Sequence, residues 1–318
     1  MIKIFDVVAI GQALVDITAC VDASFIKKHR LVKGSTQHVT KDVSDYYLSL
    51  IHPVSYSPGG TAANSLSGIA SLGGKTAYMS QVDNDRWGQL LCESFSKEGI
   101  HFKGISSRQG LGTGRCLALV TPDADRTMVT YLGTSYEFSE DNIDWALLGE
   151  TKILLVEAYQ CETVQMFEVT KRAVSFAAKK GATIVLSAAH GGCMEKHRKE
   201  LMLFVKDTVD VFVGNETEVL AFMGEEDSEH ALLKMRSLCQ ITVMTKGRAG
   251  SLIQEGTSQY SIPAPHVSNV VDTTGAGDHY LAGFLYALTQ GLSLKECGTL
   301  ASSMAGKVIS HFGARVAL

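Results

Sequence analysis

The feature that most constrains the fold is an alternation of short apolar runs with longer amphipathic stretches. Five runs rich in Val, Ile and Leu have the length and composition of buried parallel strands: they are Val7–Ile10, Ile153–Val156, Thr183–Leu186, Val209–Val213 and Ile241–Met244. Stretches with helical spacing separate several of them, at Glu162–Lys179, Met194–Val205, Glu216–Met223 and His230–Leu238. This alternation predicts an α/β fold with a central, mostly parallel sheet flanked by helices.

Two regions break the alternation, residues 13–53 and 100–138. Both carry turn signals and alternating patterns, and the second contains a predicted β-hairpin around Pro122-Asp-Ala-Asp125. We expect both regions to build one small β-sheet that acts as a lid over the carboxyl ends of the strands, where open α/β sheets bind ligands. The sequence thus predicts a single domain over residues 1–318, as a monomer or as a homodimer formed through the open edge of the lid.

Charge and composition exclude several classes of protein. The chain has 29 basic and 33 acidic residues among 318, which gives no broad electrostatic footprint for nucleic acid or an anionic membrane. No apolar run reaches the roughly 18 residues of a membrane span, and Asp6 interrupts the apolar amino terminus, which we interpret as a first strand. The seven cysteines contain no C-x-x-C pair, so we expect no disulfide framework or zinc site, and a reducing cytoplasm.

The most informative motif is Asp272-Thr-Thr-Gly-Ala-Gly-Asp278, which precedes a stretch with helical spacing. The backbone N–H groups of Gly275, Ala276 and Gly277 then lie at a helix N-terminus, where they and the helix dipole attract an anion. Asp278 lies in the first turn and can accept a proton from an attacking hydroxyl. This combination is what phosphoryl transfer to an alcohol requires. The alternative is an ordinary glycine-rich helix start with an acid in a favoured position.

A second glycine-rich helix start is Pro58-Gly-Gly-Thr-Ala-Ala-Asn64. The amide of Asn64 offers both a donor and an acceptor to a polyhydroxylated ligand, although ordinary turn and helix chemistry explains the motif equally well. Asp16 follows the first strand and can pair with sugar hydroxyls at the same edge of the sheet. Taken alone, an acid at that position is better explained as a solvated strand-end residue.

Two further strand ends carry candidates for metal and nucleotide binding. In Val213-Gly-Asn-Glu-Thr-Glu218, Asn215 and Glu218 lie three residues apart on one face and can hold water around Mg²⁺. An N-cap followed by first-turn acids explains them as well. In Thr245-Lys-Gly-Arg-Ala-Gly250, the glycines allow the backbone to approach nucleotide phosphates or ribose, and a plain β-turn is the alternative.

In this order, the motifs resemble the ribokinase-like (PfkB) carbohydrate kinases over nearly the whole chain. Asp272–Asp278 is similar to the carboxy-terminal signature of that family, and Gly59-Gly60 with Asn64 to the amino-terminal one. The opening Gly11-Gln-Ala-Leu-Val-Asp16-Ile-Thr-Ala-Cys-Val-Asp22, with Phe25 and Lys28, most resembles the adenosine kinase branch. The resemblance implies transfer of the γ-phosphate of ATP to a primary hydroxyl of a small-molecule sugar or nucleoside. The alternative from another class is a catalytically silent sensor of such a molecule.

The resemblance also implies a role for each candidate residue, with ATP and Mg²⁺ as cofactors and K⁺ as a further candidate. It implies Asp278 as base; Gly275, Ala276 and Gly277 as anion hole; Asp16, Gly60 and Asn64 as acceptor contacts; Asn215 and Glu218 near magnesium and phosphate; and Thr245, Gly247 and Gly250 as nucleotide contacts. For a monovalent cation it implies Asp272 and Thr274, completed by carbonyls near Gly313.

Four other residues have two interpretations each. His279 follows the implied base where the family usually has a small residue, so it either crowds the base or adds a pH-sensitive contact. Arg126, at the tip of the predicted hairpin, is a candidate phosphate or substrate contact, with a solvated turn as the alternative. Tyr159 and Tyr131 are candidates for stacking on a purine, with core packing as the alternative for each. The sequence does not identify the acceptor.

Overall fold

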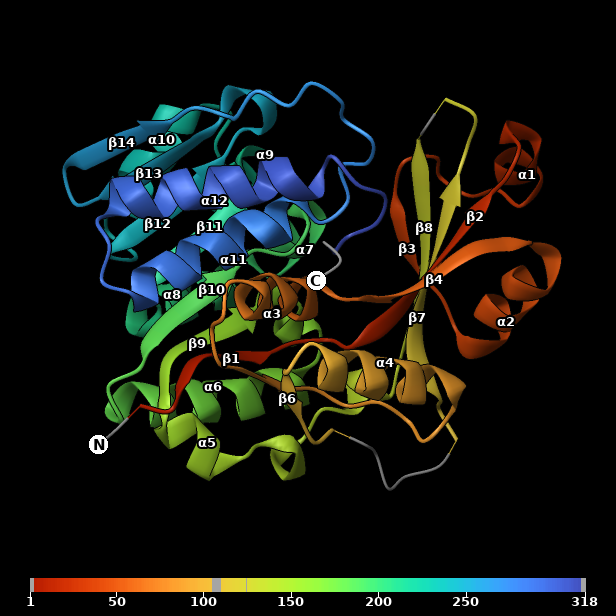
Figure 1. Cartoon of the computed structure of the whole chain (residues 1–318), viewed down its shortest axis with the longest axis horizontal. Coiled ribbons are helices and arrows are strands. Elements are labelled where there is room, and N and C mark those ends of the chain that lie inside the picture. Colours follow the sequence, from red (N-terminus) through yellow and green to blue (C-terminus); the bar gives the residue numbers. More distant parts are fainter. Residues whose placement is uncertain (1–2, 105–109, 124, 316–318) are drawn as a thin grey trace.

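A computed structural model describes residues 3–104, 110–123 and 125–315, and it arranges them as two β-sheets with helices around the larger one (Figure 1). The larger sheet has the order β14-β13-β12-β11-β10-β9-β1-β5-β6. Its strands are β1 (Phe5–Ile10), β5 (Thr76–Met79), β6 (His101–Phe102), β9 (Thr151–Glu157), β10 (Thr183–Ser187), β11 (Val211–Asn215), β12 (Ile241–Thr245), β13 (Ser251–Glu255) and β14 (Ser258–Ile262). Only β13 and β14 join antiparallel among these strands, so the predicted mostly parallel α/β fold is confirmed.

Helices cover both faces of the larger sheet, because successive residues of its strands point to opposite sides. In β1, Val7 and Ala9 pack into one apolar core, and Val8 and Ile10 pack into the other. The first core contains α3 (Thr61–Ser71), α4 (Arg86–Lys97), α11 (Ala276–Thr289) and α12 (Leu294–Val308). The second contains α5 (Trp145–Gly149), α6 (Val164–Lys179), α7 (Gly191–Lys196), α8 (Arg198–Thr208), α9 (Glu216–Met223) and α10 (Ser228–Met235).

One predicted helix, Met194–Val205, is wrong, because the chain forms α7 and α8 there. His197 lies between them with φ −105° and ψ 18°, outside the helical range. Its ring is turned toward Glu162, with Nε2 3.6 Å from Oε2. The break therefore accompanies a contact with a distant residue, and helical spacing alone does not register such a contact.

The second sheet has the order β3-β8-β7-β2-β4 and lies on the right in Figure 1. Its elements are β2 (Leu14–Cys20), α1 (Ala23–Lys28), β3 (Thr36–His38), α2 (Lys41–Leu50), β4 (Pro53–Gly59), β7 (Thr113–Val120) and β8 (Arg126–Gly133). β7 and β8 form the predicted antiparallel hairpin. The expected segment bounds need correction, since β4 runs past residue 53 and β6 joins the larger sheet. Residues 105–109 and 124 of the second expected segment, and residues 1–2 and 316–318 of the expected domain, lie outside the described residues.

The two faces of the second sheet have different neighbours. Ile17, Leu117 and Val129 are fully buried on the face that packs with α1 and α2. Asp16 and Arg126 lie on the opposite face, and Arg126 forms an ion pair with Asp272 of the larger unit. This face therefore meets the carboxyl ends of the parallel strands.

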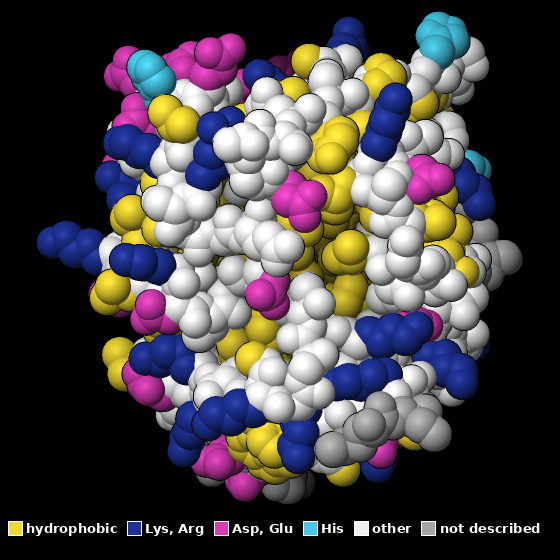
Figure 2. All heavy atoms as spheres, turned by 90° about the vertical axis from the view of Figure 1, so that its left-hand side faces the viewer, with side chains coloured by type: hydrophobic (Ala, Val, Ile, Leu, Met, Phe, Trp, Pro, Cys, Tyr) yellow, Lys and Arg dark blue, Asp and Glu magenta, His cyan; other side chains and the backbone are white. Residues whose placement is uncertain are grey.

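One face of the surface agrees with the balanced charge of the sequence (Figure 2). On the face opposite the second sheet, cationic and anionic side chains are interspersed around hydrophobic groups (Figure 2). Across the described part of the chain, no helix combines the length and apolar character that crossing a bilayer requires.

Candidate active site

The predicted site residues gather near the carboxyl ends of β1 and β9, beside the second sheet. β1 is paired in parallel with β9 on one edge and with β5 on the other. The strand order therefore runs in opposite directions from β1. Such a switch in strand order leaves a crevice at the carboxyl ends, which is where open α/β sheets bind ligands. The N-termini of α3 and α11 both reach this crevice, since Asn64 of α3 contacts Asp278 of α11.

Asp278 lies in the first turn of α11 and is half-buried. Its Oδ2 accepts a hydrogen bond from Asn64 Nδ2 at 2.8 Å. Burial raises the pKa of Asp278 to about 7, and the charge of Asp16 adds to the rise, whereas Asn64 and Arg315 oppose it. A carboxyl that titrates near neutral pH suits a general base, because a strongly ionised carboxylate is a weak proton acceptor.

The glycines before Asp278 shape the start of α11. Gly275 has φ +76°, and a Cβ there would lie 2.5 Å from the carbonyl oxygen of Ala314, so only glycine fits. The N–H of Ala276 donates to the carbonyl of Thr273 at 3.3 Å. Among the described residues, no backbone carbonyl accepts from the N–H of Gly275 or Gly277. Two of the three amides predicted for an anion hole are therefore without a backbone partner.

Asp272 anchors this helix start to two other segments. Its Oδ1 accepts from the Thr274 N–H at 2.8 Å and hydroxyl at 2.7 Å, and it also pairs with Arg126. Its Oδ2 accepts from the Gly313 N–H at 3.0 Å. Burial alone would raise the pKa of Asp272, but these donors hold the pKa at about 2. The Asp272 carboxylate is therefore already paired with a guanidinium, and the K⁺ site that the resemblance implied stays a prediction.

Asp16 lies on β2 opposite β4, on the face that meets the crevice. A Cβ at Gly59 would come within 2.4 Å of the Asp16 carboxyl carbon, so Gly59 leaves the room that this side chain occupies. Burial raises the pKa of Asp16 to about 6, against the positive charges of Arg315 and Arg126. Gly60 follows as the N-cap of α3 and leads into Asn64. The second glycine motif therefore places an acid and an amide beside Asp278.

Asn215 and Glu218 form a reciprocal capping box at the start of α9. The Asn215 side chain accepts from the Glu218 N–H at 2.9 Å, and Glu218 Oε2 accepts from the Asn215 N–H at 2.7 Å. Burial raises the pKa of Glu218 to about 7, and Asp278 is close enough to add to that rise. Both interpretations of this motif remain compatible with the structure, because the box fixes Glu218 within electrostatic reach of Asp278.

The glycine turn after β12 lies beside this capping box. Thr245 is paired with Asn215 in the parallel register of β12 and β11. The turn continues through Gly247 and Gly250, both with positive φ, before the chain returns as β13. Lys246 Nζ lies 2.8 Å from Oε1 of Glu216 in the first turn of α9. The structure thus brings the predicted metal and nucleotide residues to one end of the crevice. Within the described ranges, no cluster of three or more His, Cys, Asp or Glu side chains is arranged to hold a metal ion.

Two charged residues of the site were missed from the sequence. Glu157 ends β9 and is buried, with Oε2 accepting from the Gln12 N–H at 2.9 Å and Oε1 from the Ala62 N–H at 2.5 Å. Burial raises its pKa to about 7. The sequence signal that could have identified Glu157 is its position directly after the apolar run Ile153–Val156. The other, Arg315, contacts Asn64 and has no surrounding motif.

The structure shows the surroundings of three residues that had two interpretations each, His279, Tyr131 and Tyr159. His279 is 1% exposed and packs against α3 at Gly68, which does not support crowding of Asp278. Its Nδ1 lies 3.2 Å from the carbonyl oxygen of Gly275, and the pH-sensitive contact stays a prediction. Tyr131 lies on the α2 side of the second sheet, where its hydroxyl donates to the Leu111 carbonyl at 2.5 Å, so purine stacking by Tyr131 is wrong. Tyr159 is half-buried just beyond β9, with its ring 6.0 Å from that of His190, and both interpretations of it stand.

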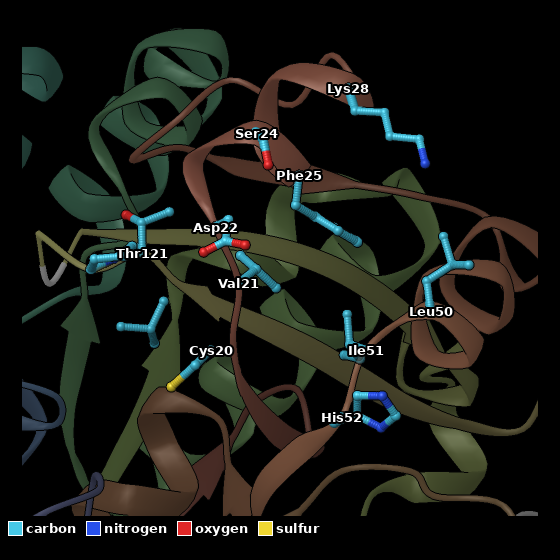
Figure 3. A pocket seen from close by; sticks show the side chains of 12 residues that line it. Cys20, Val21, Asp22, Ser24, Phe25, Lys28, Leu50, Ile51, His52 and Thr121 are labelled. Atoms are coloured by element: carbon cyan, nitrogen blue, oxygen red, sulfur yellow. The ribbon is translucent and has the colours of Figure 1, made fainter.

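A separate cavity of about 620 Å³ lies in the second sheet (Figure 3). It is lined by the ends of β2 and β7, by α1, and by the segment between α2 and β4, including Cys20, Asp22, Phe25, Lys28 and His52. None of the predicted catalytic, acceptor or nucleotide residues lines it. The cavity therefore lies outside the crevice around Asp278.

Comparisons with known proteins agree with this fold. The solved structure of adenosine kinase from Sinorhizobium meliloti matches with a TM-score of 0.94 at 31% identity, covering 99% of this chain and 96% of that one. Adenosine kinase of Saccharomyces cerevisiae is 26% identical over 329 residues, which cover 96% of this chain and 95% of the yeast protein. A ribokinase-like protein from Escherichia coli, solved in complex with ATP and Mg²⁺, shares the fold with a TM-score of 0.80 at 18% identity, covering 98% of this chain and 94% of that one.

The family itself follows from a match along the sequence. The model of the pfkB family of carbohydrate kinases matches residues 6–318, which include both glycine-rich helix starts and the second sheet. The chain therefore belongs to the pfkB family of carbohydrate kinases.

Proposed function

We propose that this protein transfers the γ-phosphoryl group of ATP to a primary hydroxyl of a sugar or nucleoside. The observation that carries the proposal is the Asp278 carboxyl, which lies at the N-terminus of α11 with a pKa near 7 and within electrostatic reach of Asp16. Family membership and the similarity to adenosine kinases support the same reaction class.

In this proposal the acceptor lies between the larger sheet and the second sheet. Asp16 accepts hydrogen bonds from the acceptor hydroxyls, and the start of α3 at Gly60 and Asn64 contacts them from the other side. The reacting hydroxyl donates to Asp278, which takes its proton as the oxygen attacks the γ-phosphorus. The bond between that phosphorus and the bridging oxygen of ADP breaks as the new phosphorus–oxygen bond forms.

The phosphoryl group would lie at the start of α11. The N–H groups of Gly275 and Gly277 point from a helix N-terminus, so they and the dipole stabilise negative charge there. The rest of ATP would extend along the strand ends toward Asn215, Thr245, Gly247 and Gly250. Mg²⁺ supplies charge neutralisation on the phosphates when bound. Asn215 and Glu218 fit it as holders of its water shell, since no described residue donates to Glu218 Oε1.

The second sheet would act as the lid. Its hairpin reaches the anion-hole segment through the pair between Arg126 and Asp272. Water competes with the acceptor for the γ-phosphoryl group, so a sheet held over the crevice favours transfer to the bound hydroxyl. This gives Arg126 a closing role and disfavours the solvated-turn interpretation.

The direct experiment measures ADP formation with a panel of acceptors: adenosine, other nucleosides, ribose, fructose and fructose phosphates. We expect adenosine to be turned over fastest, as the similarity to adenosine kinases indicates. Turnover of sugars alone would overturn the nucleoside assignment and keep the kinase. Thermal stabilisation by a ligand without ADP formation would instead support the binding-only sensor. The buried position of His279 gives no support to that sensor.

A further inference from the structure

Three consecutive residues near the carboxyl terminus each contact a different part of the candidate site. The Gly313 N–H donates to Asp272 Oδ2 at 3.0 Å. The Ala314 carbonyl oxygen lies where a side chain on Gly275 would be, 2.5 Å from an ideal Cβ. Arg315 Nε donates to Asn64 Oδ1 at 3.0 Å. This segment, residues 313–315, therefore packs around the start of α11 and reaches across to α3.

Arg315 is held in place from its other side by α4. Its NH1 lies 2.9 Å from Glu98 Oε1 and 3.2 Å from Oε2. The Arg315 and Glu98 side chains are only 11% and 14% exposed, and the guanidinium carbon lies 5.7 Å from the centre of the Phe95 ring. A buried guanidinium that is paired and packed in this way has a fixed orientation.

That orientation determines how the Asn64 amide is turned. A guanidinium has only donors, so the amide atom that faces Arg315 Nε has to be the oxygen. The amide nitrogen then faces Asp278 and donates to Oδ2 at 2.8 Å. A flipped amide would place its NH₂ group against the guanidinium and its oxygen against the carboxylate, and both contacts would be repulsive.

The charge of Arg315 acts on the same groups. It lowers the pKa of both Asp278 and Asp16, in opposition to their burial. The charge of Asp16 adds to the raised pKa of Asp278. The charge of Asp278 in turn adds to the rise that burial causes in the pKa values of Glu157 and Glu218. Arg315 thus offsets part of the negative charge of the crevice on the side of α3 and α4.

We propose that Arg315 is a positioning residue for phosphoryl transfer: through Asn64 it orients the hydrogen bond to the base, and its charge favours the ionised form of that base. The proposal rests on the proposed function, because it assigns Arg315 a role in the same reaction. Arg315 itself need not touch the acceptor or ATP.

The test compares three variants of the full chain with the wild type. Arg315→Gln removes the charge and the fixed donor, Arg315→Lys keeps the charge without the planar donor pair, and Arg172→Gln is a matched control on the exposed face of α6. We expect Arg315→Gln to lower kcat about 10- to 100-fold, as misplacement of a reacting group does, and to change the KM for ATP less than about 2-fold. The acid limb of the pH profile of kcat/KM should move to higher pH in this variant, because the charge that lowers the pKa of Asp278 is lost.

Arg315→Lys should keep the acid limb close to that of the wild type and recover only part of kcat. If Arg315→Gln does not fold because Glu98 is left unpaired, the double variant Arg315→Gln/Glu98→Gln removes that charge as well, and the same readouts apply. A residue with only a structural role would change the melting temperature without moving the acid limb.

The outcomes separate the two proposals. If the wild type is active and Arg315→Gln has the same kcat and the same acid limb as Arg172→Gln, the role of Arg315 is overturned. The proposed kinase function would then still stand. If no acceptor is turned over, the proposed function fails, and Arg315 is tested by ¹³C NMR titration of labelled aspartate carboxyls, with the Asp278 signal assigned through Asp278→Asn. An Asp278 pKa that rises in Arg315→Gln supports the charge effect, and an unchanged pKa refutes it.

Discussion

Burial raises the pKa of both Asp278 and Asp16, yet different kinds of structure hold these two carboxyls. Asp278 lies in a helix whose start is encoded by seven consecutive residues. Asp16 lies on β2, which takes its position from β4 and β7, about 40 and 100 residues away along the chain. The α/β unit thus carries the proposed chemistry on a local element, and the second sheet carries proposed acceptor binding on long-range strand pairing.

In the proposed function, the two regions have different roles. A helix N-terminus orients amides and a carboxylate without help from the acceptor, which suits charge stabilisation in the transition state. In the proposed function, a sheet tied to the crevice by the pair between Arg126 and Asp272 would instead adjust to the acceptor and exclude water. Changes in the first region should therefore lower kcat, and changes in the second should mainly alter KM and coupling.

The largest effect is expected for Asp278→Asn. The substitution keeps an oxygen that can accept from Asn64 but removes the proton acceptor, so kcat should fall at least ~10²-fold, the lower end of general-base contributions. Acceptor binding measured by calorimetry should change much less. Near-normal turnover in this variant would refute the role of Asp278 as base.

Asp16→Asn should affect the other kinetic parameter. Loss of a charged hydrogen-bond acceptor for the acceptor hydroxyls should raise the acceptor KM about 10- to 100-fold, as expected for a charge-assisted hydrogen bond. The effect on kcat should be smaller than that of Asp278→Asn. Steady-state kinetics with varied acceptor checks this, and a kcat loss as large as that of Asp278→Asn would abolish the proposed division between the two regions.

Arg126→Gln tests the closing of the second sheet. The variant loses the pair with Asp272, whereas Asp272 keeps the donors from Thr274 and Gly313. We expect transfer to the acceptor to slow about 10-fold, the effect of losing one charged hydrogen bond, and ATP hydrolysis without acceptor to rise relative to transfer. Measuring ADP formation with and without acceptor gives this ratio. An unchanged ratio would count against a lid that excludes water.

The smallest effect concerns stability. The pKa of Asp278 is raised to about 7 in the folded state, so the folded state binds this proton more tightly than the unfolded state. The resulting stability is fully present at low pH and is lost as the pH rises through about 7. Asp278→Asn should therefore melt about 2 °C higher than the wild type at pH 8, with the difference shrinking toward pH 5. Equal or lower melting temperatures at pH 8 would show that the carboxyl is not destabilised by burial.

Sequence patterns predicted the local parts of this molecule well. The five apolar runs became parallel strands, and α9 has the predicted bounds Glu216–Met223, because the capping box and Gly224 mark its two ends within the sequence. In the structure the two glycine-rich helix starts also meet, through Asn64 and Asp278, which neither motif specified on its own.

The parts that depend on distant partners could not be predicted in the same way. The strand β6 lies inside an expected lid segment but pairs with β5, and Tyr131 lies on the face of the second sheet away from the crevice. A shift of one residue in strand alternation decides which face a side chain occupies. Arg315 carries no motif at all, since its importance comes from contacts with Asn64 and Glu98, both more than 200 positions earlier.

The role of Asp278 as base can be measured through the pH dependence of kcat/KM for the wild type and Asp278→Asn with saturating ATP. Glu157 and Glu218 also have pKa values raised to about 7, so an acid limb in the wild type alone does not identify the base. We predict a limb near pH 7 in the wild type and a low, nearly flat profile in the variant. The same limb in both proteins would show that another group takes the proton and would contradict the central role of Asp278.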